Sequence, residues 1–441
     1  MLPATHLRLT EDPMTSSRLP HYLTAGALGL ALVLSSCGSQ DTTDQDAAQD
    51  EATIPGPTVQ VSEDDADTAD EESPQPAEDQ QDADQQGEEA AEDDDEAAAT
   101  QWPASNTTTM AAESTISEPV ISPKSIVSND HGLAIANNMM YQNTVTLYDT
   151  EAQELVQELS DRVSPGALGA SGYPESVVGA PVEAVWTEDG QYAYVSQYRL
   201  EDMGAGAYDD CRNGDAVAPS AVYRYSVADQ DWDQFIEVGR VPKFVELTPD
   251  GSRLLVSNWC DHDLSVVDTE TGEEINRVPV NSQPRGIAAL PDNRTVFVAA
   301  MYANELYRLD LETGEQEVIY NQAEFPRHLS LSPDAKTLYV TFAHSDLLVA
   351  FDTETNEVIR TASTGREPRS MDISADGTAL YVVNYFEDTV SKFDAETFEE
   401  IERLPTGHLP IGVTYDPVTA SVWVANYSGT ISIYDDHSNT R

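Results

Sequence analysis

A repeat of 42 residues runs through the C-terminal half of the chain and constrains its fold more than any other feature. The repeat is marked by prolines at Pro242, Pro284, Pro326, Pro368 and Pro410. With each proline as position 0, position +14 is always valine, at Val256, Val298, Val340, Val382 and Val424. Position +26 is always aspartate, at Asp268, Asp310, Asp352, Asp394 and Asp436. A fixed period of this length is typical of tandem units that stack on one another and share a core.

Each unit consists of short predicted strands separated by turns. An apolar segment follows the proline, then a turn such as TPDG at 248–251, then a segment such as LYVTF at 338–342. β-Branched and aromatic residues alternate in these segments, and Pro, Asp and Gly separate them, which is the pattern of strands and turns. No segment favours a helix, so the sequence predicts an all-β fold.

Two less regular copies precede these five and bring the number of units to seven. Pro181 has Val195 at +14, and Pro123 has Asp149 at +26. The last unit stops after three strands, and we expect residues 107–119 to supply its fourth. Such a strand would close the units into a ring and remove the exposed sheet edges that otherwise invite aggregation.

The repeats resemble those of a known family. The units SPDAKTLYVTFAHSDLLVAFDTETNEVI (332–359) and SADGTALYVVNYFEDTVSKFDAETFEEI (374–401) resemble YVTN-type repeats of the YncE-like β-propeller family, over about residues 120 to 436. The resemblance implies a seven-bladed β-propeller of four-stranded antiparallel blades. It also implies an exported protein, often without an assigned catalytic activity.

The N-terminal segment has the parts of a secretory signal. Arg18 provides a positive start, residues 23–34 are apolar, and the segment ends in Leu34-Ser35-Ser36-Cys37. These four residues resemble a bacterial lipobox, which implies cleavage before Cys37 and attachment of lipid to it. Residues 1–36 are then a signal peptide, with Met14 as an alternative start. An ordinary signal peptide with an incidental cysteine is the other interpretation.

An acidic segment separates the signal from the repeats. Residues 38–100 contain 23 acidic residues and no Lys or Arg, a composition that favours disorder. We therefore divide the chain into a signal peptide (1–36), a lipidated cysteine with a disordered acidic tether (37–105) and a propeller (106–441). The predicted location is extracytoplasmic and lipid-anchored, on either the inner or the outer membrane.

The net charge limits the possible partners. The chain carries 79 acidic and 22 basic residues, for a net charge of −57. A field of this sign opposes nucleic acid binding. We expect a monomer that contacts the membrane through its lipid and binds an anionic small molecule, a glycan or a protein.

The predicted ligand site lies on the face of the ring where the prolines begin each unit, which we call the top. The residue after the proline is basic in five of the seven units, at Lys124, Lys243, Arg285, Arg327 and Arg369. Position +17 is mostly large, and includes Trp259, Tyr385 and Tyr427. Two long insertions, at about 161–180 and 199–219, open on the same face. These features form either a basic funnel for an anion or a set of ion pairs between units.

The remaining cysteines and histidines give few further sites. Once Cys37 is lipidated, Cys211 and Cys260 are the remaining cysteines, and export favours a disulfide between them; free thiols are the alternative. His328 and His344 are weak candidates for a metal ligand or an acid–base group. No metal-binding or triad-like motif occurs, so we predict no cofactor, no metal and no catalytic residue.

Three functions remain open after the sequence analysis. The first is a non-enzymatic binding or interaction module that uses the basic top face. The second is a propeller enzyme of the lactonase or quinoprotein dehydrogenase type, which similarity to such propellers implies. The third is a structural protein of the cell envelope. A lactonase should gather carboxylates and histidine around a metal or water, whereas the repeated position here is cationic, so the sequence favours binding.

Overall fold

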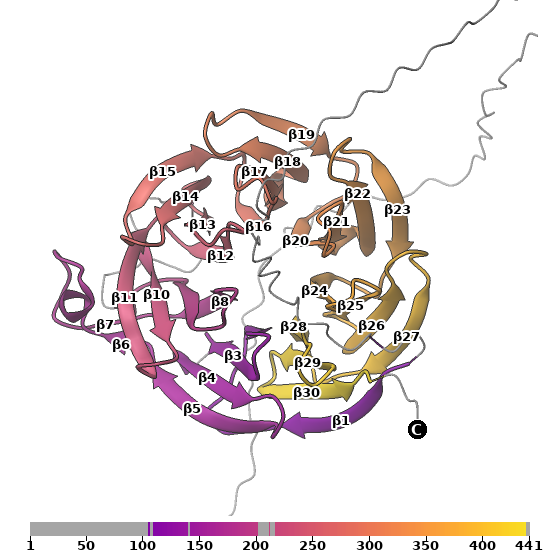
Figure 1. Ribbon diagram of the computed structural model, residues 1–441, viewed down its shortest axis with the longest axis horizontal. Helices are drawn as coiled ribbons and strands as arrows, with labels where there is room; N and C mark the ends of the chain where they lie inside the picture. The colour runs from indigo at the N-terminus through magenta and orange to yellow at the C-terminus, as the bar shows by residue number, and fades with distance from the viewer. Residues whose placement is uncertain (1–104, 106–108, 140–141, 202–210, 212–216, 438–441) are drawn as a thin grey trace, which may run out of the picture. The chain divides into compact units, whose positions relative to one another are not determined.

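The described part of the chain is a closed ring of seven β-sheets. The computed structural model describes residues 105, 109–139, 142–201, 211 and 217–437. These residues form seven sheets, or blades, of four antiparallel strands, arranged around one axis (Figure 1). The predicted seven-bladed β-propeller is confirmed. The signal peptide, Cys37 and the acidic segment lie outside the described residues.

Within the first six blades, the strands follow one another from the inner to the outer edge of the ring. The strands of these blades are β2 (Ser125–Ser128), β3 (Leu133–Asn138), β4 (Thr144–Asp149) and β5 (Glu154–Ser160) in blade 1; β8 (Pro181–Trp186), β9 (Tyr192–Gln197), β10 (Ser220–Ser226) and β11 (Asp231–Val238) in blade 2; β12 (Pro242–Leu247), β13 (Arg253–Asn258), β14 (Asp263–Asp268) and β15 (Glu274–Pro279) in blade 3; β16 (Pro284–Ala289), β17 (Thr295–Ala300), β18 (Glu305–Asp310) and β19 (Gln316–Tyr320) in blade 4; β20 (Pro326–Leu331), β21 (Thr337–Phe342), β22 (Leu347–Asp352) and β23 (Val358–Ser363) in blade 5; and β24 (Pro368–Ile373), β25 (Ala379–Asn384), β26 (Thr389–Asp394) and β27 (Glu400–Pro405) in blade 6.

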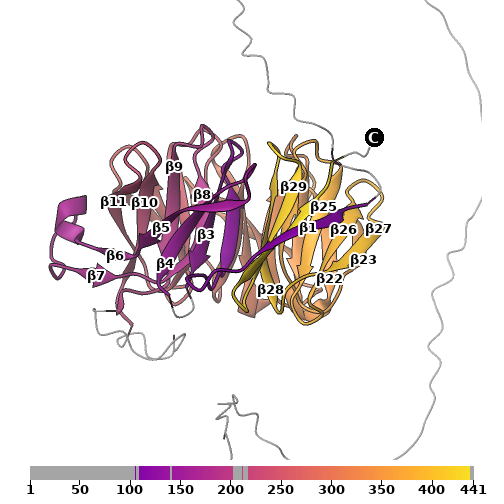
Figure 2. The same cartoon turned by 90° about the horizontal axis from the view of Figure 1, so that it is seen from below.

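Blade 7 joins the two ends of the described chain. It contains β28 (Pro410–Asp416), β29 (Ser421–Asn426), β30 (Thr430–Asp435) and, as its outer strand, β1 (Ala111–Ile116). β1 is antiparallel to β30 and pairs Ala111 with Asp435 and Ile116 with Ile431. Figure 2 shows β1 running along the outside of this blade. The ring is therefore closed by the segment that the sequence analysis expected.

Apolar side chains fill the spaces between neighbouring blades. Seven clusters of buried residues each span one pair of adjacent blades. Every cluster receives the residue at position +3 of an inner strand, and these residues are Ile126, Ala184, Val245, Ile287, Leu329, Met371 and Val413. Burying such side chains stabilises each blade against its neighbour by about 1.5–3 kcal/mol per large residue.

A buried ion pair adds to the contact between blades 6 and 7. Nζ of Lys392 lies 2.6 Å from Oδ1 of Asp436, and both side chains are 0% exposed. The hydroxyl group of Tyr381 donates to the other oxygen of Asp436 at 2.5 Å. The +26 aspartates thus differ in role: Asp268 caps a turn by accepting from the backbone N–H of Thr271 at 2.8 Å, whereas Asp436 pairs with a neighbouring blade.

The first insertion folds away from the axis. Between β5 and β8, residues 161–180 form β6 (Arg162–Val163), a 3-10 helix η1 (Pro165–Leu168) and β7 (Val177–Val178). This hairpin projects from the rim of the ring (Figures 1 and 2). Tyr173 packs edge-on against Phe235 of the outer strand β11, with ring centroids 4.8 Å apart. The insertion thus begins at the top, but its packing is against the outside of blade 2.

The second insertion is tied to blade 3. Cys211 and Cys260 form a disulfide, and Cys260 belongs to an eighth apolar cluster, together with Tyr198, Trp259 and Met301. The rest of this insertion lies largely outside the described residues. In the described part of the chain, no helix is long and apolar enough to cross a bilayer.

Candidate functional site

The inner strands place three layers of side chains along the axis of the ring. Position +1 forms the cationic layer at the top, which consists of Lys124, Lys243, Arg285, Arg327 and Arg369, with Val182 and Ile411 in the other two blades. Position +2 forms the upper channel layer, with Ser125, Glu183, Phe244, His328 and Ser370 among its members. Position +4 forms the lower channel layer, with Val127, Val185, Glu246, Ala288, Ser330, Asp372 and Thr414.

Two glycines allow the inner strands to approach one another at the upper layer. A Cβ atom on Gly286 would lie 2.7 Å from the carbonyl oxygen of Arg327, and one on Gly412 would lie 2.9 Å from Cα of Ser125. Both distances are too short for a real side chain. The backbones of neighbouring blades therefore meet directly at these two points.

A strained residue stands before the proline in blades 3 to 7. Its φ angle is positive in every case, at Val241 (57°), Gln283 (54°), Phe325 (60°), Glu367 (56°) and Leu409 (57°). Residues other than glycine rarely adopt this left-handed conformation, which costs about 1–3 kcal/mol. The bend precedes the inner strand in each of these blades, and in blades 3 to 6 it lies two residues before a cation of the top layer.

Side chains of the preceding blade hold these bends in place. The backbone N–H of Gln283 donates to Nδ1 of His262 at 2.9 Å, and that of Phe325 donates to Oδ1 of Asn304 at 3.0 Å. In the next two blades, the backbone N–H of Glu367 donates to Oδ1 of Asp346 at 2.7 Å, and that of Leu409 donates to Oδ1 of Asp388 at 2.8 Å. The base of the cationic layer is thus preorganised by hydrogen bonds between blades.

Glu183 of the upper channel layer pairs with two residues of the cationic layer above it. Its Oε1 atom lies 3.4 Å from Nζ of Lys124 and 3.4 Å from Nη2 of Arg285. Burial lowers the pKa of Lys124 well below its usual value; Glu183 opposes this effect, and Arg285, Arg327 and Lys243 reinforce it. Several like charges are therefore held close together around one carboxylate.

Arg327 is the least compensated of these cations. Its side chain is buried, with the residue 7% exposed, and its Nε–H donates to the carbonyl oxygen of Arg369 at 3.0 Å. No carboxylate of the described residues forms an ion pair with it. Burial, followed by Arg285 and Arg369, lowers the pKa of Arg327. A buried guanidinium in such a setting favours a bound anion, because unpaired buried charge is costly.

Two cations of the layer, Lys243 and Arg369, lie against aromatic rings. Nζ of Lys243 lies 4.3 Å from the ring centroid of Tyr198 and 4.8 Å from that of Trp259. The guanidinium of Arg369 lies 3.8 Å from the centroid of Tyr385 and pairs with Glu367. Such cation–π contacts stabilise a positive charge by about 0.5–2 kcal/mol.

The aromatic residues predicted for the site pack mainly on one another. Trp259 is buried and lies edge-on to Tyr302, with centroids 5.4 Å apart. Tyr385 and Tyr427 are half-buried, and their centroids are 6.5 Å apart. Trp259 and Tyr385 therefore support the cationic layer through their contacts with Lys243 and Arg369, and Tyr427 packs against Tyr385.

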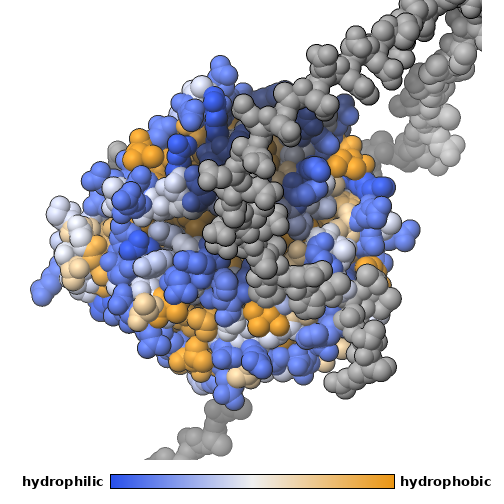
Figure 3. Space-filling model, in the orientation of Figure 1, coloured by the Kyte–Doolittle hydropathy of each residue, from blue (hydrophilic) through white to orange (hydrophobic). Residues whose placement is uncertain are grey.

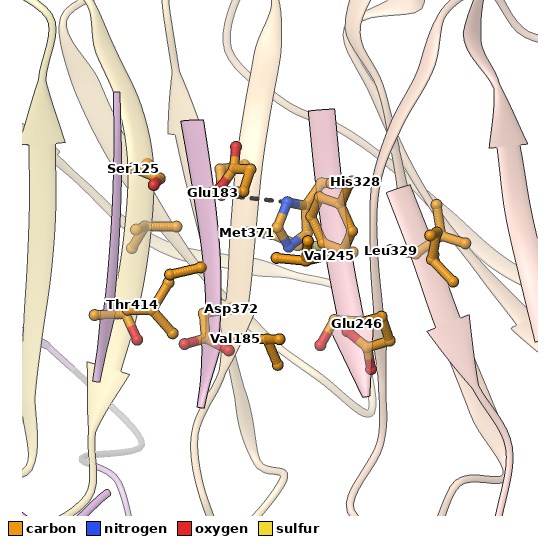
Figure 4. Close-up of a pocket in the computed structure, with 18 of the residues that line it drawn as sticks. Ser125, Glu183, Val185, Val245, Glu246, His328, Leu329, Met371, Asp372 and Thr414 are labelled. Carbon is orange, nitrogen blue, oxygen red and sulfur yellow. Dashed lines mark hydrogen bonds between the residues drawn. The ribbon is translucent and has the colours of Figure 1, made fainter. Parts of the chain in front are cut away.

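Below the cations, the channel contains a cavity of about 240 Å³. Figure 4 shows Glu183 and His328 at one level of it and Glu246, Asp372 and Thr414 at another. His328 lies edge-on to Phe244, with centroids 5.4 Å apart, and its Nδ1 is 3.4 Å from Oγ of Ser370. Burial, together with Arg285, Arg327 and Lys124, lowers the pKa of His328 to about 3. The imidazole is therefore neutral at pH 7.

The lower channel layer contains carboxyl groups, whereas the top layer contains cations. Burial raises the pKa of Glu246 to about 8. Burial also raises the pKa of Asp372 to about 6, against hydrogen bonds from the backbone N–H groups of Tyr415 and Ile373. At the lower mouth, burial, followed by the neighbouring carboxylates of Asp372 and Asp416, raises the pKa of Asp130 to about 7. The channel thus passes from cations to protonatable carboxyl groups.

The structure separates the two candidate histidines. His328 points into the cavity, whereas His344 is exposed at the top, stacked on Phe325 with centroids 3.6 Å apart. No group of three His, Cys, Asp or Glu residues in the described chain is arranged to hold a metal ion. The two histidines are therefore not brought into one site.

Sequence analysis missed Glu183, Glu246 and Asp372. Positions +2 and +4 vary between blades, so the repeat does not mark them, unlike the basic position +1. Their signal is a carboxylate at +2 or +4 of an inner strand, next to the apolar residue at +3, as in PVEAVW (181–186) and PKFVEL (242–247). A buried charge in such a strand points to the channel, since the alternate residues pack between blades.

The drawn face of the ring shows no broad apolar area. In Figure 3, apolar groups lie as small, separate patches on a largely hydrophilic surface, outside the atoms drawn in grey. Isolated apolar residues of this kind are normal on soluble proteins. The channel is therefore a better candidate for a binding site than this surface.

Comparisons with known proteins support the fold. A family model described as "Lactonase, 7-bladed beta-propeller" matches residues 320–399, less than a fifth of the chain. Among curated proteins, no sequence matches this chain. A solved chain of Kuenenia stuttgartiensis hydrazine synthase is 17% identical, with a TM-score of 0.57 over 72% of this chain and 96% of its own length.

A chain of a mitotic checkpoint complex is 13% identical, with a TM-score of 0.58 over 80% of this chain and 97% of its own length. Similarity at such low identity concerns the propeller fold alone. Together with the seven blades, these matches place the chain among β-propeller proteins.

Proposed function

We propose that the protein is an exported, lipid-anchored binding module of the YVTN-repeat type, which takes an anionic ligand at the cationic layer of its channel. The observation that carries the proposal is Arg327, buried beside Arg285 and Lys124 and without a carboxylate partner in the described chain. An anion bound there would relieve the mutual repulsion of these cations and compensate their burial.

The charge distribution supports the same proposal. Residues 101–441 contain 54 acidic and 20 basic residues, yet five of the basic residues form this one layer. A local positive site in an acidic protein selects small anions that can enter it and disfavours extended polyanions, which the surrounding surface repels. The lipobox-like sequence at Cys37 supports anchoring of the module on the outside of the cell membrane.

The test is anion binding by the full chain. We expect isothermal titration calorimetry with sodium phosphate and sodium sulfate, at constant ionic strength, to detect binding. The Arg327→Gln variant should lose at least about tenfold in affinity, equivalent to about 1.4 kcal/mol. Lys336→Gln is the matched control, because Lys336 is a cation whose side chain is 81% exposed, and it should bind as the wild type does.

Two results would overturn the proposal. One is a wild-type chain that binds neither anion. The other is an Arg327→Gln variant that unfolds at a lower temperature but binds anions with unchanged affinity. This result would mean that Arg327 stabilises the contact between blades and does not bind the anion.

A second candidate is a lactonase-like enzyme, which the family match to residues 320–399 favours. His328 lies in this segment and lines the cavity. With a pKa of about 3, its imidazole is a weak general base, since efficient bases have pKa values near the working pH. The cations around it suit binding of an anion better than activation of water, so we place binding first.

A further inference from the structure

The cavity below the cationic layer has two poles. Its upper end is lined by Glu183 and His328, directly under Lys124, Arg285 and Arg327, which lower the pKa of His328 and so lie close to it. Its lower end is lined by Glu246 and Asp372. Figure 4 shows these two carboxyl groups at the same level, on opposite sides of the view.

Among the described residues, none is a partner for the charge of Glu246. No described residue donates a hydrogen bond to its carboxyl group or forms an ion pair with it, and burial alone accounts for its raised pKa. Asp372 differs, because it accepts from two backbone N–H groups at 2.8 Å each. Glu246 is half-buried and lines the cavity, and a carboxyl group in such a setting without partners either stays protonated or receives a cation.

The spacing of the poles follows from the inner strands. The cations are at +1 and the lower carboxyl groups at +4, so three residues separate them along each strand. At about 3.3 Å per residue, the two poles lie about 10 Å apart along the strand. A volume of about 240 Å³ is below the usual range for drug-sized ligands, so the occupant is a small molecule.

We infer that the channel binds a small elongated molecule that carries an anionic group at one end and an ammonium group at the other. The anionic end meets the cationic layer, and the ammonium end meets Glu246 and Asp372. This inference rests on the proposed function for its upper pole and adds the lower one. An elongated molecule with an anionic group at each end would be repelled at the lower pole, and one with an ammonium group at each end would be repelled at the upper pole.

The experiment compares molecules that differ in one charged group. 6-Aminohexanoate carries both groups, hexanoate lacks the ammonium group, and hexylamine lacks the carboxylate. We expect calorimetry with the full chain at pH 8 to give at least tenfold tighter binding of 6-aminohexanoate than of either analogue. Glu246→Gln should remove its advantage over hexanoate and leave hexanoate binding unweakened. Glu270→Gln, at an exposed carboxylate, is the control and should retain the full preference.

Protonation gives a second readout, which a purely structural role of Glu246 would not change. An ammonium group beside Glu246 favours its ionised form and so releases a proton on binding. The heat of binding of 6-aminohexanoate should therefore depend on the ionisation enthalpy of the buffer near pH 7, and much less so in Glu246→Gln. The other titratable groups that line the channel are Glu183 and Glu188 from blade 2, Asp130 from blade 1, His328 from blade 5 and Asp372 from blade 6.

The outcomes separate this inference from the proposed function. If hexanoate and 6-aminohexanoate bind equally well to the wild type, the lower pole is not a cation site, and the inference fails while anion binding stands. If Glu246→Gln keeps the full preference for 6-aminohexanoate, the assignment of Glu246 is wrong. If phosphate, hexanoate and 6-aminohexanoate all fail to bind, both the proposed function and the inference are wrong.

Discussion

At the scale of single residues, the buried pair of Lys392 and Asp436 shows how strongly one charge can affect the stability of the fold. Both side chains are fully buried between blades 6 and 7. The attraction within such a pair is largely offset by the loss of hydration of both ions. Removing one partner, however, leaves the other charge buried and unpaired.

We therefore expect Lys392→Met to lower the free energy of unfolding by about 3–5 kcal/mol, measured by denaturant-induced unfolding at pH 7. Arg294→Met is the matched control. Arg294 pairs with Asp310 at 2.6 Å, but its side chain is 43% exposed, so solvent screens the pair and the change should have little effect on the free energy of unfolding. Equal losses in the two variants would contradict the importance of burial here.

The sequence predicted single residues where the repeat marks them. The five cations at +1 are conspicuous because the same position is basic in five units. Their partners were not predictable, because Glu183 in blade 2 meets Lys124 of blade 1 and Arg285 of blade 4. Such contacts depend on closure of the ring, which brings together residues that are distant in the sequence.

At the scale of elements, β1 is the strand that closes the ring. It is the outer strand of blade 7 and the one strand of that blade that comes from the start of the described chain. Met110, next to it, is buried in the cluster between blades 6 and 7. Without β1, the outer edge of β30 would be left unpaired.

We expect deletion of residues 109–118 from the full chain to lower the melting temperature by at least several degrees and to promote aggregation, because an exposed strand edge pairs with other chains. Circular dichroism and light scattering would measure both effects. Deleting ten residues of the acidic segment, 85–94, is the control for chain length and should change neither. Unaltered melting after loss of β1 would refute its role in closure.

The period of 42 residues predicted the strands well, since it repeats turn and strand chemistry in register. It gave no information on residues 161–180, which have no counterpart in the other units. Their hairpin packs on the outside of blade 2 through Tyr173 and Phe235. A contact of this kind depends on the shape of the folded blade, and no local sequence pattern predicts it.

At the scale of the whole molecule, the net charge of −57 opposes compaction, because like charges repel one another across the surface. Salt screens this repulsion, with a Debye length of about 10 Å at 0.1 M and about 3 Å at 1 M. We expect the melting temperature to rise by several degrees between 0.05 M and 1 M sodium chloride, measured by calorimetry. Potassium chloride should act equally, and an unchanged melting temperature in both salts would count against the prediction.

The alternation along the inner strands has a consequence for how such a protein can diversify. The residues at +3 lie in the clusters between blades, while those at +2 and +4 face the channel. Substitutions at the channel positions can therefore alter what the protein recognises with little effect on the contacts that hold the blades together. Of the fourteen such positions, Gly286 and Gly412 leave no room for a side chain, and Phe244 and Ala288 also pack between blades. The other ten positions allow a lineage to acquire new specificities while inheriting the same scaffold.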